Sequence, residues 1–433
     1  MILAKNHRRR SSGNKSGRSS NTIVLYLLMF MVLVNVQSCA FIEDLFGKKE
    51  EKTRPADKER ERKDEVKEVE WEDVTKEEEV IREYPHKADE KKEFFDVLCF
   101  LPLNGDHMQK GRDLYAGLKM AANDYRSDLK IRFTTFDVNK VRKEPEIVRK
   151  LLSTPEFDMI IAPYATADVN QVIELAKGSG AVILSPWNTS SSVDRFKGYI
   201  QLNPGIESHF KHIADFSQRE FGAGRSVIIG AKKDASSVEM LKQFSPGMNV
   251  YYTSSNPKND FEEISHLISS KNIKSVIIPS WRSADESYFL SLLSTINSAR
   301  QNQKINVFML ASWLNNDKIQ YEQFRGMNLH FTNSRFIDYR RGAIQRFDDA
   351  YYQKFDFFAT EDVYYGHDIF LLASGLFQKF GYENMDQIVN FECQDCLFRY
   401  DFVNQVESGG NSFIQNDQVD IISWENYQYQ RVN

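Results

Sequence analysis

Short apolar runs alternate with amphipathic helical patterns over most of the chain from Phe95 onward. Two junctions stand out, VLCFLPLNGDHMQKG from Val97 and DMIIAPYATADVNQV from Asp158, where an apolar run stops at Pro-containing polar residues and a helical pattern follows. Such runs indicate strands buried on both faces of a parallel sheet that helices cover on both sides. These sheets bind ligands beyond the carboxyl ends of their strands. We therefore expect the functional site at these two turns.

The pattern predicts two successive groups of strands and helices. In the first group, strands are expected at 96–102, 130–137, 158–162, 181–185 and 199–202, and helices at 108–125, around 146–152 and at 167–177. In the second, helices are expected at 206–221, 236–244, 261–270 and 284–301, and strands at 226–231, 249–253, 275–279, 306–310 and 329–333. Helices at 342–355 and 361–380 follow, and the tail beyond residue 381 indicates short strands and turns. Asn203-Pro204-Gly205 separates the groups, so the sequence predicts an α/β fold of two doubly wound lobes with a cleft between them.

The N-terminus has the features of an export signal. A basic stretch that includes residues 8–10 precedes an apolar run from Thr22 to Val34, which is too short for a comfortable membrane span of about 20 residues. The run leads into Val36-Gln37-Ser38-Cys39, which resembles the signal of bacterial lipoproteins, where the Cys is acylated. An uncleaved signal anchor is the alternative. Two or three acyl chains on Cys39 would hold the protein stably at a membrane.

Residues 40–94, which follow this predicted signal peptide of residues 1–39, are dominated by mixed charges. They contain too few apolar side chains to bury a core, so we expect a solvated tether.

The whole chain of 433 residues has a net charge of −5. Its globular part shows no basic face with interleaved aromatic residues, which argues against a nucleic-acid partner.

Three cysteines remain besides Cys39. Cys99 lies in an apolar run, where a buried thiol is the usual state. Cys393 and Cys396 have no matching Cys or His pair that would complete a zinc site, and in an exported protein a local disulfide is the expected alternative. The GxSxG, HExxH, GxxxxGK[ST] and GxGxxG motifs are absent from the sequence. We therefore expect no enzyme, no catalytic residue, no metal and no cofactor.

The ordered series of blocks resembles the type I periplasmic-binding-protein family, which includes the leucine-type receptors of ABC transporters. The opening block is VLCFLPLNG with GRDLYAGLKMAANDY, the central block is IIAPYATADVNQVIELAKGSGAVILSPWNTSS, and the closing block is AIQRFDDAYYQKF with VYYGHDIFLLASGL. The resemblance extends from about Phe95 to the C-terminus. It implies two lobes that are joined by three crossovers and close on a small ligand. The expected lobes are 95–203 plus 336–390 and 204–335 plus 391–433.

The resemblance also implies a ligand site. In the amino-acid receptors of this family, the turns after the third and fourth strands hold the ligand carboxylate, and an aromatic residue of the second lobe covers the ligand. Backbone N–H groups at a helix N-terminus together with a hydroxyl suit an anion. The candidate ligand-binding residues are Tyr164, Ala165, Thr166, Trp187, Asn188, Thr189, Ser190, Trp281, Arg282 and Trp313. The alternatives are packing between the lobes for the four aromatic residues, helix capping for Thr166 and Ser190, and an exposed helix start for Arg282. His209 and His212 are interpreted as surface residues.

Two departures from the family pattern argue against a standard α-amino acid ligand. Trp313 stands where the receptors have an acidic partner for the ligand ammonium, and Pro163-Tyr164 stands where they have Gly and a small residue. The first functional hypothesis is a lipid-anchored extracytoplasmic solute-binding protein of the bacterial cell envelope that holds a small, amino-acid-like ligand between two hinged lobes and serves an ABC transporter permease. The alternative is a degenerate relative that binds and regulates a cell-wall synthase, as some lipoproteins of similar fold do.

Overall fold

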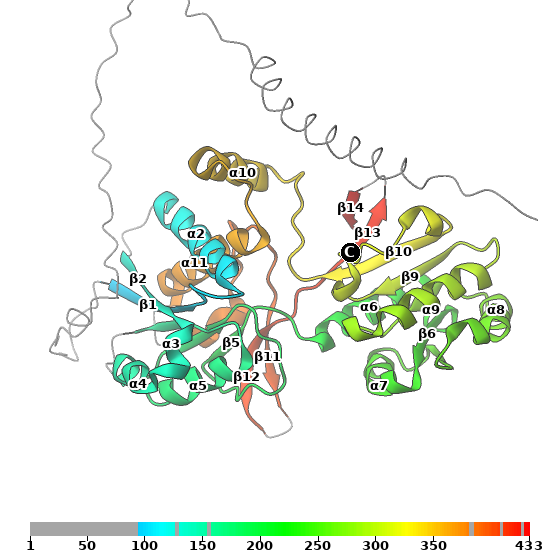
Figure 1. Cartoon of the computed structure of the whole chain (residues 1–433), viewed down its shortest axis with the longest axis horizontal. Coiled ribbons are helices and arrows are strands. Elements are labelled where there is room, and N and C mark those ends of the chain that lie inside the picture. The colour runs from blue at the N-terminus through cyan, green and yellow to red at the C-terminus, as the bar shows by residue number, and fades with distance from the viewer. Residues whose placement is uncertain (1–93, 126–129, 154–156, 381–384, 408–409, 426–427) are drawn as a thin grey trace, which may run out of the picture. The chain divides into compact units, whose positions relative to one another are not determined.

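The alternating apolar runs form two seven-stranded sheets in the computed structural model (Figure 1). The structure describes residues 94–433 apart from 126–129, 154–156, 381–384, 408–409 and 426–427. The predicted signal peptide, Cys39 and all of the predicted tether except its last residue lie outside the described residues. Among the described residues, no helix is both long and apolar enough to span a membrane.

The first sheet has the strand order β11-β12-β5-β4-β3-β1-β2. All neighbours in it are parallel except β11 and β12, which are antiparallel. The strands are β1 (Phe94–Leu101), β2 (Lys130–Asp137), β3 (Met159–Ile161), β4 (Val182–Ser185), β5 (Tyr199–Gln201), β11 (Phe402–Val406) and β12 (Ser412–Asn416). Because β2 and β3 lie on opposite sides of β1, the chain reverses direction across the sheet at β1, and a crevice is expected beyond the strand ends there.

The second sheet repeats this arrangement in the order β14-β13-β10-β9-β8-β6-β7. The strands are β6 (Ser226–Ala231), β7 (Asn249–Thr253), β8 (Ser275–Ile277), β9 (Ile305–Met309), β10 (Met327–Asn333), β13 (Asp420–Glu425) and β14 (Gln428–Arg431). The first five are parallel to one another, β13 is antiparallel to β10, and β14 is antiparallel to β13.

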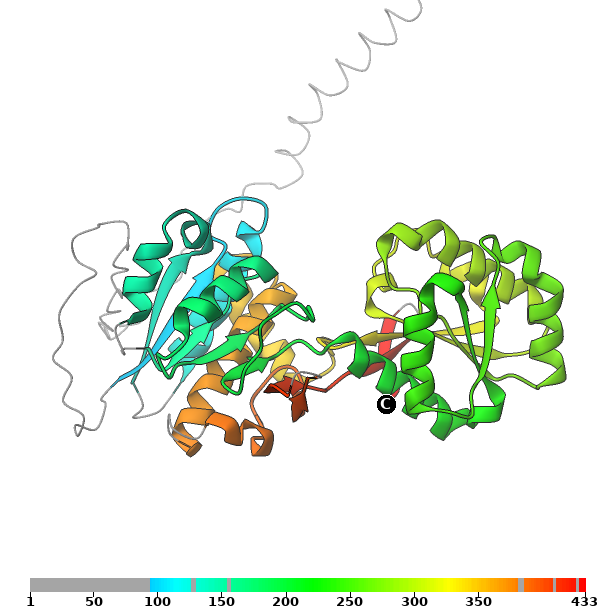
Figure 2. The ribbon, with the colours of Figure 1, turned by 90° about the horizontal axis from the view of Figure 1, so that it is seen from below.

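Helices lie on both faces of each sheet (Figure 2). The first sheet is accompanied by α2 (Met108–Asp124), α3 (Val138–Lys143), α4 (Pro145–Ser153), α5 (Thr166–Ala176), α10 (Gly342–Phe355) and α11 (Glu361–Phe380). The second is accompanied by α6 (Ile206–Phe221), α7 (Ala235–Phe244), α8 (Phe261–Ser270) and α9 (Glu286–Ala299). Each β1 side chain from Val97 to Leu101 is fully buried, and alternate residues enter two different cores. The predicted α/β fold with two doubly wound lobes is confirmed.

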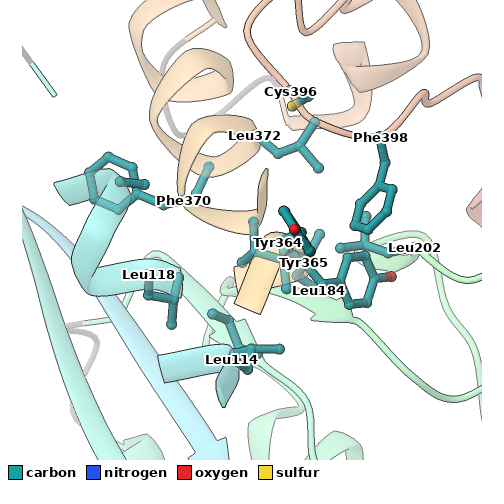
Figure 3. Close-up of a cluster of buried hydrophobic side chains, with 14 of the residues drawn as sticks. Leu114, Leu118, Leu184, Leu202, Tyr364, Tyr365, Phe370, Leu372, Cys396 and Phe398 are labelled. Carbon is teal, nitrogen blue, oxygen red and sulfur yellow. The ribbon is translucent and has the colours of Figure 1, made fainter. Parts of the chain in front are cut away.

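The larger core of the first lobe joins α2 and α11 to one face of the sheet (Figure 3). Figure 3 shows Leu114 and Leu118 of α2 with Tyr364, Tyr365 and Phe370 of α11. Cys99 is buried in this core, and Cys393 and Cys396, expected as a local pair, form a disulfide next to it.

The C-terminal tail differs from the expected lobe boundaries. Residues 391–433 were expected in the second lobe, yet β11 and β12 are strands of the first sheet. The reason is the pairing of Ile414 with Ile200, which adds β12 parallel to β5. The chain therefore passes to the second sheet between Asn416 and Asp420. This segment contacts the earlier one that leaves β5 for the second lobe, because Asn416 donates a hydrogen bond from Nδ2 to the Leu202 carbonyl (3.0 Å).

Candidate functional site

A cavity of about 890 Å³ opens beside the loops that follow β3, β4, β5, β8 and β9. These loops leave the carboxyl ends of neighbouring parallel strands, where doubly wound sheets present their ligand sites. The cavity is called the strand-end pocket below. It is lined by Tyr164, Ala165, Thr166, Trp187, Asn188, Thr189, Ser190, Ser191, Asn203, Pro204, Ile206, His209, Trp281, Leu310, Ala311 and Ser312. Eight of the ten residues predicted from the sequence are in this lining. The turn that follows the strand from Asp158, singled out in the sequence, contributes to it, whereas no residue of the other such turn, from Val97, lines the pocket.

The loop after β3 supplies the first wall. Tyr164 is half-buried, and its ring lies 4.5 Å from that of His107 and 5.9 Å from that of Trp187, measured between ring centroids. Ala165 is the N-cap of α5, and its methyl group cannot accept a hydrogen bond from the helix. The N-terminus of α5, which lies at the pocket wall, therefore has no side-chain cap. Thr166 Oγ1 accepts a hydrogen bond from Nδ2 of Asn188 (2.8 Å), which ties the two loops together.

The loop after β4 is fixed from behind by the start of α11. Tyr365 donates a hydrogen bond to the Pro186 carbonyl (2.7 Å), and Trp187 donates from Nε1 to the buried carboxylate of Asp362 (3.0 Å). Asp362 also pairs with Lys110 (3.1 Å) and lies 3.6 Å from Arg335. These contacts hold Trp187, which is only 7% exposed, in one orientation at the pocket wall.

The remaining wall comes from residues of the second sheet and its helices. Trp281 follows β8 and is 47% exposed, which leaves its indole free to contact a ligand. His209 lies in the first turns of α6, and its Nδ1 is 2.8 Å from Oγ1 of the buried Thr332. Burial and the nearby His212 lower the pKa of His209 to about 4, against an opposing effect of Asp417. His209 is therefore neutral at pH 7.

Two predicted ligand residues do not line the pocket. Trp313 is 2% exposed and stacks on Phe289 with a centroid separation of 4.0 Å, and its Nε1 donates to the Ser280 carbonyl (2.7 Å). Its indole therefore belongs to the core of the second lobe, and the predicted ligand contact is wrong. Arg282 is turned to acidic partners, with Nε donating to Asp285 (3.1 Å) and Nη2 lying 3.5 Å from Asp234.

The sequence interpretation missed several residues of the pocket. His209, read as a surface residue, lines it, as do Asn203 and Pro204 of the segment recognised as a crossing point. Ser312 and Ala311 come from the turn after β9, where an acidic residue was sought. For Asn203, Pro204, Ala311 and Ser312 the available signal was their position, because each follows a predicted strand at its carboxyl end.

The described residues that line the pocket include no Asp, Glu, Lys or Arg. Its polar groups are hydroxyls, amides, the His209 ring and backbone groups, and three aromatic side chains add apolar surface. In the described part of the chain, no group of three or more His, Cys, Asp or Glu side chains could hold a metal ion. Such an arrangement suits the reversible binding of an organic molecule.

Two histidines with lowered pKa values, His209 and His330, predict a loss of stability in mild acid. Burial also lowers the pKa of His330 to about 4, and an unfolded histidine titrates near 6.5. The unfolded chain therefore binds more protons between these values, so stability is complete above pH 6.5 and falls as the pH drops toward 4. We expect His330 to account for a loss of about 2 kcal/mol in unfolding free energy between pH 7.5 and 5, and the partly exposed His209 for less.

Urea unfolding at pH 7.5, 6 and 5 measures this loss. The His330→Gln variant should show a shallower pH dependence than the native chain, and His266→Gln, a change at an exposed helix position, should leave the dependence unaltered. Equal slopes for the native chain and His330→Gln would contradict the prediction.

No protein-family model and no curated protein sequence matches this chain. Solved structures do match. A putative branched-chain amino acid ABC transporter protein from Rhodospirillum rubrum superposes with a TM-score of 0.58 at 11% identity and covers 78% of this chain and 99% of its own. An ABC-type branched-chain amino acid transporter protein from Rhodopseudomonas palustris superposes with a TM-score of 0.54 at 11% identity and covers 79% of this chain and 96% of its own. An ABC transporter substrate-binding protein from Desulfitobacterium hafniense in complex with Leu superposes with a TM-score of 0.50 at 13% identity and covers 78% of this chain and 99% of its own.

The chain has the type I periplasmic-binding-protein fold. The structural neighbours of this fold are solute-binding proteins of ABC transporters. At this low identity, the likeness establishes the fold, and the function must be argued from the site itself.

Proposed function

We propose that this protein is an extracytoplasmic solute-binding protein that holds a small organic ligand in the strand-end pocket. The observation that carries the proposal is the pocket itself, about 890 Å³ in volume and lined by loops of both sheets. A ligand in contact with loops of both sheets would stabilise the arrangement in which those loops are close together. Such closure is how a binding protein could signal its loaded state to a transporter permease.

The polar end of the ligand would be held by the loops after β3 and β4. Thr189 is exposed in the pocket wall, and its hydroxyl has no hydrogen-bond partner among the described residues. The Thr166 hydroxyl accepts from Asn188, which leaves its own proton for a ligand oxygen. Together with the uncapped N-terminus of α5, these donors favour a carboxylate or another acceptor group. The rings of Tyr164, Trp187 and Trp281 would cover the apolar part.

The proposed location is the bacterial cell envelope, with the chain attached through acylated Cys39 and residues 40–93 as a spacer. This rests on the sequence features of the N-terminus. A role as regulator of a cell-wall synthase is the second possibility. It would leave the strand-end pocket without a ligand.

Thermal unfolding of the full chain against a panel of amino acids, other small carboxylates, sugars and short peptides tests the proposal. A ligand at 100 times its Kd should stabilise the protein by about 2.7 kcal/mol, which appears as a rise in Tm. A panel without any stabilising compound would contradict a solute-binding function and favour the regulator.

Thr189→Val is expected to weaken a stabilising carboxylate about tenfold, because a hydrogen bond to a charged group contributes about 1.5–3 kcal/mol. The change preserves the shape of the side chain and breaks no hydrogen bond between described residues. Thr134→Val in β2, outside the pocket lining, is the matched control and should leave the Kd unchanged. Isothermal titration calorimetry measures both values, and equal affinities for Thr189→Val and the native chain would exclude this role.

A further inference from the structure

The strand-end pocket offers several hydrogen-bond donors, and the acceptors among its side chains are all uncharged. The amide oxygens of its two asparagines are already engaged, since Asn188 Oδ1 accepts from the Ser190 N–H (2.9 Å) and Asn203 Oδ1 accepts from Ser334 (3.0 Å). The lining contains no carboxylate among the described residues. An ammonium group is a donor only, and its burial without an anionic partner costs several kcal/mol. The pocket therefore disfavours a ligand with an amino group.

His209, on α6, adds a donor to the pocket lining. The buried Thr332 hydroxyl accepts a hydrogen bond from the Ala311 N–H (3.1 Å), so its own proton can be donated to Nδ1 of His209, 2.8 Å away. With Nδ1 accepting, the ring proton is on Nε2. This Nε2 has no hydrogen-bond partner among the described residues, and the side chain lines the pocket. His209 thus offers a neutral N–H donor to a ligand.

We propose that the ligand is a small organic acid with a hydroxyl or keto group in place of an amino group, and that His209 selects it by donating from Nε2 to that oxygen. This inference rests on the proposed solute-binding function. The carboxylate would lie at Thr166 and Thr189, and the second oxygen would face His209. The low pKa of the imidazole, about 4, keeps this donor uncharged at neutral pH.

Calorimetric titration of the full chain with matched pairs of probes tests the ligand class. The pairs are L-leucine with 2-hydroxy-4-methylpentanoate, L-phenylalanine with 3-phenyllactate, and L-alanine with lactate, whose members differ only in the group on the α-carbon. The hydroxy acid should bind at least tenfold more tightly than the amino acid in the pair that binds best. Equal or tighter binding of the amino acid would overturn the inference.

Two variants separate the donor of His209 from its structural role. His209→Asn keeps an acceptor near the position of Nδ1 for Thr332 and removes the donor, so it should lose the tenfold preference for the hydroxy acid. His209→Gln places an amide N–H near the position of Nε2 and should retain the preference. If both variants keep the preference, His209 does not select the ligand.

A gain of charge gives an independent readout. Ser312 is an exposed residue of the pocket lining, and Ser312→Asp introduces the carboxylate that an ammonium requires. The variant should bind the amino acid of the best pair at least tenfold more tightly than the native chain does. An unchanged affinity would overturn the argument from the missing anion.

If only neutral compounds such as sugars bind the native chain, the inference fails and the solute-binding function stands. If no small molecule binds, both fail.

Discussion

Gly366→Ala is expected to destabilise the protein by about 3 kcal/mol or more, because it forces α2 and α11 apart. A Cβ atom on Gly366 would lie 1.9 Å from the carbonyl oxygen of Leu114, and one on Gly117 would lie 1.9 Å from that of Val363. Both obstacles are backbone atoms, which no change of rotamer can relieve. The two helices can therefore pack this closely only while both positions lack a side chain.

Urea unfolding compares Gly366→Ala with Gly224→Ala, where an added Cβ would meet no atom within 4 Å. The control should unfold at the same urea concentration as the native chain or a higher one. Since Gly117 and Gly366 belong to one helix crossing, the double variant should cost clearly less than the sum of the single changes. Additive effects, or a loss under 1 kcal/mol for Gly366→Ala, would show that the helices can separate freely.

The same variant should also weaken ligand binding. The first turns of α11 carry Asp362 and Tyr365, whose hydrogen bonds hold Trp187 and the Pro186 carbonyl at the strand-end pocket. A displaced α11 moves these anchors, and an error of about 1 Å in a binding group is costly. Stability and affinity should therefore fall together, although Gly366 is not a residue of the pocket lining.

Local patterns were sufficient to predict most elements. The predicted bounds of α6, α8, α10 and α11 agree with the structure, because each has a clear apolar periodicity between polar or glycine-containing segments. Helix α3 was not predicted. Its six residues, VNKVRK, are mainly polar, and the helix depends on the Asp137 cap and on burial of Val138 and Val141 against the first lobe.

Long-range pairing could not be read in the same way. The strand patterns of β11 and β12 are compatible with either sheet, and only the pairing of Ile414 with Ile200, far earlier in the chain, assigns them to the first. Burial of Phe402 and Phe413 in the two cores of the first lobe favours this sheet over the second. A one-dimensional pattern contains no information on which of two similar edges a strand will join.

At the site, too, features that depend on the local sequence were predicted, and contacts between residues far apart in the chain were not. The turn after β3 was predicted from the fold class, because parallel sheets place ligand sites at the carboxyl ends of their strands, and the turn after β4 was predicted from the family resemblance. The turn after β1 was predicted on the same ground, but it does not line the pocket. Trp313 was assigned to the ligand from its loop position, but Phe289 of α9 offers a stacking surface that buries it. His209 was missed because the spacing of His209 and His212 on α6 is the same whether the helix face meets solvent or a pocket.

Asp368→Ala should destabilise the protein by about 4 kcal/mol, because one buried carboxylate anchors the segment that follows the disulfide. Asp368 in α11 is fully buried and accepts hydrogen bonds from the backbone N–H groups of Leu397 (2.7 Å) and Phe398 (2.8 Å). It also accepts from the hydroxyl of Tyr400 (3.2 Å). Burial raises the pKa of Tyr400 well above its usual value, so this phenol stays protonated as a donor. Without the carboxylate, two buried backbone donors lose their acceptor.

Asp368→Asn separates the loss of acceptors from the loss of packing. The amide keeps one oxygen but turns an NH₂ group toward a backbone N–H, so the variant should remain destabilised by at least about 2 kcal/mol. Asp349→Ala, at an exposed position of α10, should change the unfolding free energy by less than about 0.5 kcal/mol. Hydrogen exchange at Leu397 and Phe398 should speed up in both Asp368 variants, since their amide protons then lack a full partner. Native-like exchange at these two amides, together with a loss under 1 kcal/mol for Asp368→Ala, would mean that the disulfide and the packing of Phe398 hold the segment without the carboxylate.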